Sequence, residues 1–264
     1  MISGDIYQNQ FSEEHMIYYK TFGIQGSKTL VLGSSLGTSS NMWNNIIEDL
    51  AQKFFVVTFD TRGHGQSQQL GLQESSVEQY AEDVIEIMDF LNIKSFSYAG
   101  LSLGGAIGQI LAIKYPTRVE RLILCCTAAK FGEPEFWYNR ANQVLDQGLN
   151  SILEATKSRW YTPGTAESNA FAQSLLDELL TFDPVGYANT CKAVAKFDVR
   201  AQLNEIQCPT LAIAGTEDLS TPVSVMQDLV SHIPNAELIA VSDAAHIGNV
   251  EKPEAFKNAI LNFA

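Results

Sequence analysis

The chain has 264 residues, of which 45% are hydrophobic and 18% are charged, and this composition is that of an ordinary globular protein with a sizeable core. Lys and Arg number 17 against 30 Asp and Glu, so the formal charge is -13 and a general phosphate-neutralising surface is absent. We therefore expect neither nucleic acid nor a membrane as a partner, while a monomer and a small homo-oligomer both fit the acidic balance.

The N-terminal sequence and the cysteines favour a cytoplasmic protein. The first residues lack a basic stretch followed by an apolar one, and no apolar run approaches the roughly 18 residues of a membrane span. The four cysteines show no C-x-x-C pair and no His/Cys cluster at zinc spacing, so we expect free, buried thiols and no metal site. They are Cys125, Cys126, Cys191 and Cys208.

Short apolar runs alternate with helical patterns along the first half of the chain. Each of the first three runs is followed by a glycine-containing turn, as expected at the end of a strand. The alternation is typical of βαβ units, which build a mostly parallel sheet with helices on both faces. The predicted strands are 29–32, 54–59, 95–99 and 121–126, and the predicted helices are 42–50, 77–91 and 103–115.

This alternation stops after Thr127 and resumes near Cys208. The stretch between them is far too long for a loop, so we expect a helical cap over residues 128–207, inserted into a core of residues 1–127 and 208–264. The helical patterns in the cap are 136–145, 151–160, 171–182 and 186–197. The core is then predicted to continue with strands 211–214 and 237–241 and helices 223–233 and 253–263.

Residues 100–104 read Gly-Leu-Ser-Leu-Gly, a G-x-S-x-G motif between a predicted strand and a predicted helix. A nucleophilic serine needs this setting, because a strained turn projects its hydroxyl from the sheet and small neighbours let strand and helix approach. Ser102 is therefore the candidate nucleophile. A glycine-rich turn that binds a phosphate, or nothing, is the alternative interpretation of the motif.

A nucleophilic serine requires a base and an acid, which follow it in this order: serine, acid, histidine. His246 comes just after the last predicted strand, at the same sheet edge as Ser102, and is the candidate base. Asp218 directly follows strand 211–214 and is the candidate acid, with Glu217 and Asp243 as rivals. Asp243 could contact His246 locally, but a triad acid usually comes from another strand.

The transition state of acyl transfer carries a negative oxygen that needs preorganised donors. One donor is expected to be the N–H of Leu103, directly after the nucleophile. The other is expected from the loop after strand 29–32, where we favour Ser35, with Leu36 as its neighbour.

The run Asp-Thr-Arg-Gly-His-Gly-Gln-Ser at residues 60–67 is a further turn motif. Asp60 ends a predicted strand, Arg62 can hold its carboxylate, and the glycines allow positive φ angles. The run has neither metal-ligand spacing nor G-x-G-x-x-G. We interpret it as structural scaffold and infer neither a metal nor a nucleotide.

These motifs, in this order, resemble the α/β-hydrolase family across almost the whole chain. Several local stretches are similar to the 3-oxoadipate enol-lactonases of aromatic-compound catabolism, above all the cap stretch 186–200. The other stretches are 34–38 with Met42 and Trp43, 100–105, 127–130, 159–163 and 245–253. The resemblance implies an α/β-hydrolase fold: a mostly parallel eight-stranded sheet flanked by helices, with a helical cap inserted after the sixth strand.

The resemblance also implies an activity. It implies a serine hydrolase that acts on a carboxylic ester and opens 3-oxoadipate enol-lactone to 3-oxoadipate without a cofactor, in the degradation of protocatechuate and catechol. This small-molecule lactone carries a carboxylate, so a local cation is expected in the site. Arg140 is our first choice, with Arg159 and Lys130 as alternatives. Trp137 and Trp160 are expected to be pocket walls.

Two other functions stay open. A different serine hydrolase on this scaffold, such as a carboxylesterase, a carbon–carbon bond hydrolase or a perhydrolase, would use the same three residues. A non-catalytic receptor for a small ligand is the second, and the presence of Ser102, Asp218 and His246 argues against it.

Overall fold

The computed structural model describes residues 17–264, in which seven strands form one mixed sheet. The strand order is β1-β3-β2-β4-β5-β6-β7, and β1 runs antiparallel to β3 while the other neighbours are parallel. The predicted α/β fold class is thus confirmed. The strands are β1 Tyr19–Phe22, β2 Thr29–Gly33, β3 Phe55–Phe59, β4 Phe96–Leu101, β5 Val119–Cys125, β6 Thr210–Gly215 and β7 Ala236–Val241.

The resemblance implied a sheet of eight strands. Residues 17–264 supply seven, and the long helical segment follows the fifth of them, β5, where the prediction had the sixth. The six strands predicted from apolar runs are all present, and β1 is the seventh. Residues 1–16 lie outside the described part of the chain.

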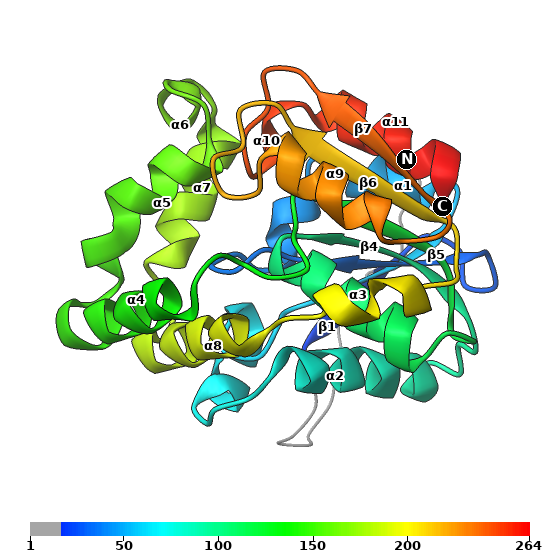
Figure 1. Ribbon diagram of the computed structural model, residues 1–264, viewed down its shortest axis with the longest axis horizontal. Coiled ribbons are helices and arrows are strands. Elements are labelled where there is room, and N and C mark those ends of the chain that lie inside the picture. Colours follow the sequence, from blue (N-terminus) through cyan, green and yellow to red (C-terminus); the bar gives the residue numbers. More distant parts are fainter. Residues whose placement is uncertain (1–16) are drawn as a thin grey trace.

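Helices lie along both faces of the sheet, with α2 and α3 on one side and α1 and α11 on the other (Figure 1). The single helix predicted over 42–50 is instead a 3₁₀ turn, η1 Ser40–Trp43, capped by the side chain of Ser39, followed by a short α-helix. No helix within residues 17–264 is long and apolar enough to cross a bilayer. The core helices are α1 Ile47–Ala51, η2 Gly65–Gly71, α2 Val77–Phe90, α3 Leu103–Lys114, α9 Val223–Ser231, α10 Gly248–Glu251 and α11 Pro253–Phe263.

A helical segment lies between β5 and β6, beyond the carboxyl ends of the parallel strands, at the left in Figure 1. Lys130 and Asp198 form an isolated antiparallel bridge, which shows that the two ends of this segment lie side by side. We call this segment the cap; its boundaries at 128 and 207 stay a prediction. Its helices are α4 Pro134–Gln147, η3 Leu149–Ile152, α5 Leu153–Trp160, α6 Thr165–Ser168, α7 Ala170–Leu179, α8 Pro184–Lys196 and η4 Arg200–Glu205.

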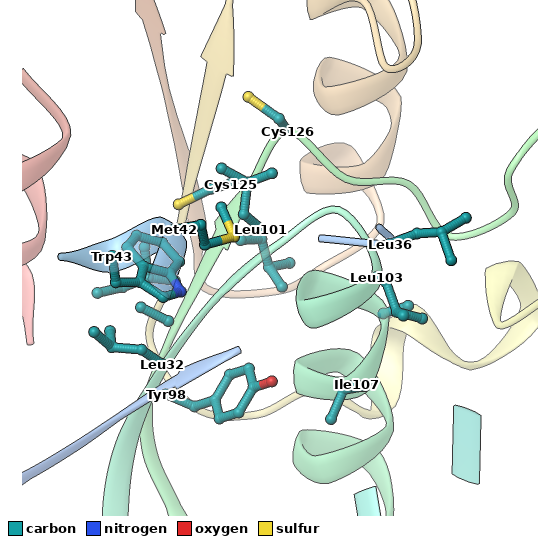
Figure 2. Packing of buried hydrophobic residues seen from close by; sticks show 14 of the residues in the cluster. Leu32, Leu36, Met42, Trp43, Tyr98, Leu101, Leu103, Ile107, Cys125 and Cys126 are labelled. Carbon is teal, nitrogen blue, oxygen red and sulfur yellow. The ribbon is translucent and has the colours of Figure 1, made fainter. Parts of the chain in front are cut away.

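The junction of β4 and α3 is packed closely enough to require glycine. Tyr98 is fully buried, its ring points from β4 toward α3 (Figure 2), and its hydroxyl donates to the Gly104 carbonyl at 3.0 Å. Gly104 N–H in turn donates to the Ser34 carbonyl at 3.0 Å. A Cβ on Gly104 would lie 2.3 Å from the carbonyl oxygen of Gly33. Helix α3 can therefore begin beside the end of β2 only with glycine at this position.

We predict that Gly104→Ala destabilises the protein by about 3 kcal/mol, the upper part of the range for overpacking. The new Cβ would meet the Gly33 carbonyl and the Ser34 nitrogen, and both groups belong to the backbone. Helix propensity alone would make the same change stabilising by about 1 kcal/mol. Urea unfolding of both proteins measures the difference. Gly132→Ala is the control, because a Cβ there meets no atom within 4 Å and only its φ of 60° opposes the change. Equal losses in the two variants would contradict the close approach.

Candidate active site

Ser102 occupies the tight turn that joins β4 to α3. Its backbone lies at φ 57° and ψ -113°, a region that residues with side chains rarely adopt. Gly100 permits the turn, because a Cβ there would lie 2.2 Å from the Gly104 carbonyl oxygen. Thr127 stabilises the turn, because its hydroxyl donates a hydrogen bond to the Ser102 carbonyl at 2.7 Å. The Ser102 side chain is consequently held at the carboxyl edge of the sheet.

The structure brings Ser102, His246 and Asp218 into one hydrogen-bonded row. His246 Nε2 lies 2.8 Å from Ser102 Oγ, and His246 Nδ1 lies 2.9 Å from Asp218 Oδ2. All three are buried, with Ser102 the most exposed at 8%. An imidazole that donates from Nδ1 to the carboxylate leaves Nε2 free to accept the serine proton. The arrangement is therefore that of an activated nucleophile.

Asp218 is the carboxylate that contacts the histidine, and its two rivals are elsewhere. Glu217 accepts from the Thr216 hydroxyl, and the exposed Asp243 lies near Lys252. Burial alone would raise the pKa of Asp218, but the charge and hydrogen bond of His246, with hydrogen bonds from Thr221, outweigh it and lower that pKa to about 2. The carboxyl is thus held as an anion.

The loop that carries His246 is attached to the cap through Glu251, which sequence reasoning missed. One Glu251 oxygen accepts from Ala245 N–H at 2.6 Å. The other accepts from the Thr162 N–H, the Thr162 hydroxyl and the Thr165 hydroxyl at 2.7–2.9 Å. The one sequence signal was an acidic residue five positions after His246. The position of the histidine consequently depends on cap residues.

The loop after β2 carries Ser35, the expected oxyanion donor, and its role stays a prediction. Ser35 N–H donates to the sulfur of Met42 at 3.3 Å, and a thioether is a weak acceptor. Among residues 17–264, the N–H groups of Leu36 and Leu103 have no hydrogen-bond partner. Ser35 and Leu36 both line the pocket beside Ser102. The N–H of Leu36, the neighbour of Ser35, is thus a second candidate donor in this loop.

The turn at 60–67 also differs from its prediction in one pair. Arg62 forms a two-pronged ion pair with Asp83, at 2.6 and 2.7 Å, and does not hold Asp60. The Asp60 carboxylate instead accepts from the backbone N–H groups of Ser40 and Gln66, at 2.8 and 2.9 Å. The prediction paired Arg62 with Asp60 because the two are close in the sequence. Asp83 lies 21 residues after Arg62, in α2, and only the fold brings it near.

A cavity of about 260 Å³ opens onto Ser102 and His246 between the sheet edge and the cap. Arg140, Trp137 and Trp160 all line it, and Arg159 does so as well; their binding of a substrate stays a prediction. Lys130 does not line the cavity; it pairs with Glu133 at 3.4 Å. Within residues 17–264, no group of three or more His, Cys, Asp and Glu side chains is arranged to hold a metal ion.

The two pocket arginines have no carboxylate partner in the described part of the chain. Arg140 donates to the Tyr187 hydroxyl at 2.9 Å and to the Thr156 hydroxyl at 2.6 Å. Arg159 lies over the ring of Phe136, 4.7 Å from its centroid. Burial, followed by the charge of Arg140, lowers the pKa of Arg159. Two guanidinium groups without a carboxylate partner, beside Ser102, can receive an anionic group.

Comparison with known proteins places this geometry among hydrolases. Residues 28–253 match the family described as the α/β hydrolase fold. The chain is 40% identical over 250 residues to 3-oxoadipate enol-lactonase 2 of Acinetobacter baylyi, with 94% of this chain and 93% of that one covered. It is similar to the crystal structure of an enol-lactonase from Burkholderia xenovorans LB400, at 34% identity and a TM-score of 0.90, over 94% of this chain and 95% of that one. It is also 30% identical to a proposed carbamate hydrolase, RutD, of Agrobacterium fabrum, over 89% and 92% of the two chains.

We predict that Asp218 makes stability depend on pH below about 4. The pKa of Asp218 is about 2 in the folded protein and roughly 3.9 in the unfolded chain. The ionised carboxylate therefore stabilises the fold fully at pH values above the unfolded pKa. That contribution, roughly 2 kcal/mol, is lost as pH falls toward the lower value. Between pH 5 and 3, the free energy of unfolding should therefore fall more steeply in the wild type than in Asp218→Asn.

Asp243→Asn is the matched control, because the Asp243 side chain is 83% exposed and lies 3.9 Å from Lys252. Urea unfolding at several pH values should give this variant the slope of the wild type. Identical slopes for the wild type and Asp218→Asn would contradict the lowered pKa.

Proposed function

The chain belongs to the α/β-hydrolase family, and from that premise we propose that it hydrolyses 3-oxoadipate enol-lactone to 3-oxoadipate through an acyl-enzyme at Ser102. The observation that carries the proposal is the pocket: two arginines without carboxylate partners beside the Ser102–His246–Asp218 row. The similarity to the Acinetobacter enol-lactonase supports the choice of substrate. The reaction would belong to aromatic-compound catabolism.

The first half of the reaction forms a bond between Ser102 Oγ and the lactone carbonyl carbon. His246 Nε2, 2.8 Å from that oxygen, takes the hydroxyl proton, and Asp218 stabilises the resulting imidazolium. Negative charge develops on the carbonyl oxygen. The N–H of Leu103 and the N–H of Ser35 or of its neighbour Leu36 are the donors proposed to hold it.

The collapse of this intermediate breaks the bond to the ring oxygen and opens the lactone. The departing enol oxygen accepts the proton from His246, and the enol then converts to a ketone. His246 next takes a proton from a water molecule as the water attacks the acyl carbon, and returns that proton to Ser102 Oγ. The released product carries two carboxylates.

The anionic end of the substrate is proposed to bind Arg140 and Arg159, with Trp137 and Trp160 as apolar walls. A charge-assisted hydrogen bond from a guanidinium contributes about 1.5–3 kcal/mol.

We predict that Arg140→Gln lowers kcat/KM for the anionic lactone by about 10- to 100-fold, mainly through KM, which is the fold-change of the lost charge-assisted bond. A neutral acetate ester, assayed beside the lactone, should change by less than about threefold, because it places no anion at this end of the pocket. Equal losses on both substrates would show that Arg140 serves the pocket only through Tyr187 and Thr156.

Carbamate hydrolysis is the second candidate, favoured by the similarity to RutD. The same serine and histidine could attack a carbamate carbonyl. A carbamate without an additional anionic group would leave the two arginines unused, so the pocket favours the lactone. A carbamate turned over faster than the lactone would reverse this order.

The substrate is tested by following the ultraviolet loss of freshly generated 3-oxoadipate enol-lactone. We predict rapid loss with the wild type and at least a 10³-fold slower loss with Ser102→Ala, since the covalent route is removed. Ser102 should also react with a fluorophosphonate. Labelling of Ser102 without loss of the lactone would keep the hydrolase chemistry and contradict the substrate.

A further inference from the structure

Glu251 lies between the loop of His246 and the cap, and each of its carboxylate oxygens faces a backbone N–H. One oxygen accepts from Ala245 N–H at 2.6 Å, and the other accepts from Thr162 N–H at 2.8 Å. A backbone N–H only donates, so both oxygens have to act as acceptors, as they do in an ionised carboxylate. An amide has one acceptor oxygen beside a nitrogen that only donates, so it could not form both bonds.

The cap side of this bridge consists of one turn. The hydroxyls of Thr162 and Thr165 lie 2.7 and 2.9 Å from the Glu251 oxygen that accepts Thr162 N–H. Thr162 follows the end of α5, and Thr165 begins α6. Thr165 N–H donates to the Thr162 carbonyl at 3.2 Å, which closes the turn. The carboxylate thus binds the turn between α5 and α6.

The backbone of Glu251 belongs to the core. Glu251 ends α10, a helix that Asn249 attaches to the segment after β2. The buried Asn249 side chain donates to the Met42 carbonyl at 2.8 Å, and its own carbonyl accepts from the Asn45 side chain at 2.7 Å. The glutamate is therefore fixed on the core, and its side chain is where the cap turn and the histidine loop both attach.

His246 lies between two residues whose N–H groups are both held toward the cap. Ala245 N–H donates to Glu251, and Ile247 N–H donates to the Trp160 carbonyl at 3.0 Å. Trp160 ends α5, directly before the turn that Glu251 binds. The backbone on both sides of the histidine is thus attached to the same part of the cap.

The core holds the same loop at a neighbouring group. Glu217 N–H donates to the Ala244 carbonyl at 2.9 Å, so the peptide between Ala244 and Ala245 has one bond to the core and one to Glu251. Ala245 is buried. Without Glu251 its N–H would lose its partner away from water, which is costly enough to favour a shift of the loop.

We propose that Glu251 is a positioning residue for the catalytic base: its carboxylate holds the loop of His246 against the cap turn, so that Nε2 stays within reach of Ser102 Oγ. Nε2 and Oγ lie 2.8 Å apart, and a displacement of about 1 Å between reacting groups can cost about 100-fold in rate. Glu251 does not line the cavity itself. The inference rests on the proposed role of His246 as base but not on the identity of the substrate.

The first test is Glu251→Gln. Whichever way the amide turns, its nitrogen faces the N–H of Ala245 or that of Thr162, and one end of the bridge is lost. We expect kcat for the lactone to fall about 10- to 100-fold, with KM changed less than about threefold. Glu254→Gln is the control, because Glu254 is an exposed residue of α11 that pairs with Lys257. It should leave both constants unchanged.

The second test shows whether Glu251 acts through His246. The rate at which a fluorophosphonate labels Ser102 is measured with and without Glu251→Gln, in the wild type and in His246→Ala. A residue that only places the base has no effect once the base is gone. Glu251→Gln should therefore slow labelling at least about 10-fold in the wild type and less than about twofold in His246→Ala.

Glu178→Gln is the matched variant for this cycle. Glu178, in α7 of the cap, also connects cap and core, since it accepts from the Ser39 hydroxyl and the Asn41 side chain, both at 2.7 Å. These partners lie in the loop after β2 and not in that of His246. The factor by which Glu178→Gln changes labelling should be the same with and without His246. If its effect also vanished in His246→Ala, any contact of the cap would act in this way and the proposal would be wrong.

Thr162→Val combined with Thr165→Val keeps the carboxylate and decides the question if Glu251→Gln does not fold. The double variant leaves one donor on the cap side, so it should slow labelling about three- to tenfold, and that effect should vanish in His246→Ala. Equal slowing in both backgrounds, or wild-type labelling by a variant that is less stable in urea, would show that Glu251 serves stability alone. Wild-type labelling without lactone turnover would reject only the substrate, and the labelling cycle would still decide the role of Glu251.

Discussion

Ser102 lies at φ 57° and ψ -113°, a conformation that costs about 1–3 kcal/mol and persists only where the surroundings hold it. The surroundings here are backbone: Gly100 and Gly104 approach each other, and Gly104 approaches the end of β2. This one turn aims the hydroxyl at His246 and leaves Leu103 N–H free at the start of α3. The same contact brings the loop after β2, with Ser35 and Leu36, beside Ser102.

The remaining parts of the site are held from the cap as well as from the sheet. Ile247 N–H donates to the Trp160 carbonyl at 3.0 Å, and Glu251 connects the histidine loop to Thr162. Trp160 ends α5, the helix that also carries Arg159 into the pocket. Arg159, which is proposed to bind the substrate anion, thus lies on a helix that is attached to the loop of His246. A shift of α5 would therefore move both Arg159 and the loop of His246.

Much of this arrangement is visible in the sequence, because its determinants are local. A G-x-S-x-G between an apolar run and a helical pattern identified Ser102, and the order of residues after strand ends located Asp218 and His246. The parallel strands then bring these ends together. Most helices and strands were likewise found to within a few residues from their apolar spacing.

The parts that the sequence could not reveal depend on contacts between distant segments. Arg62 was paired with nearby Asp60, while the fold offers Asp83 of α2. The hydrogen bonds of Glu251 cross from α10 to the cap in the same way.

The most direct test of the account is the intact mass of the protein, quenched in acid from milliseconds to seconds after mixing with 3-oxoadipate enol-lactone. Ring opening leaves the former ring attached to the acyl group, so the adduct should add the full mass of the lactone. It should appear on the peptide that contains Ser102 and decay as product forms. A burst of product with no adduct at any time, or an adduct on another residue, would contradict covalent catalysis at Ser102.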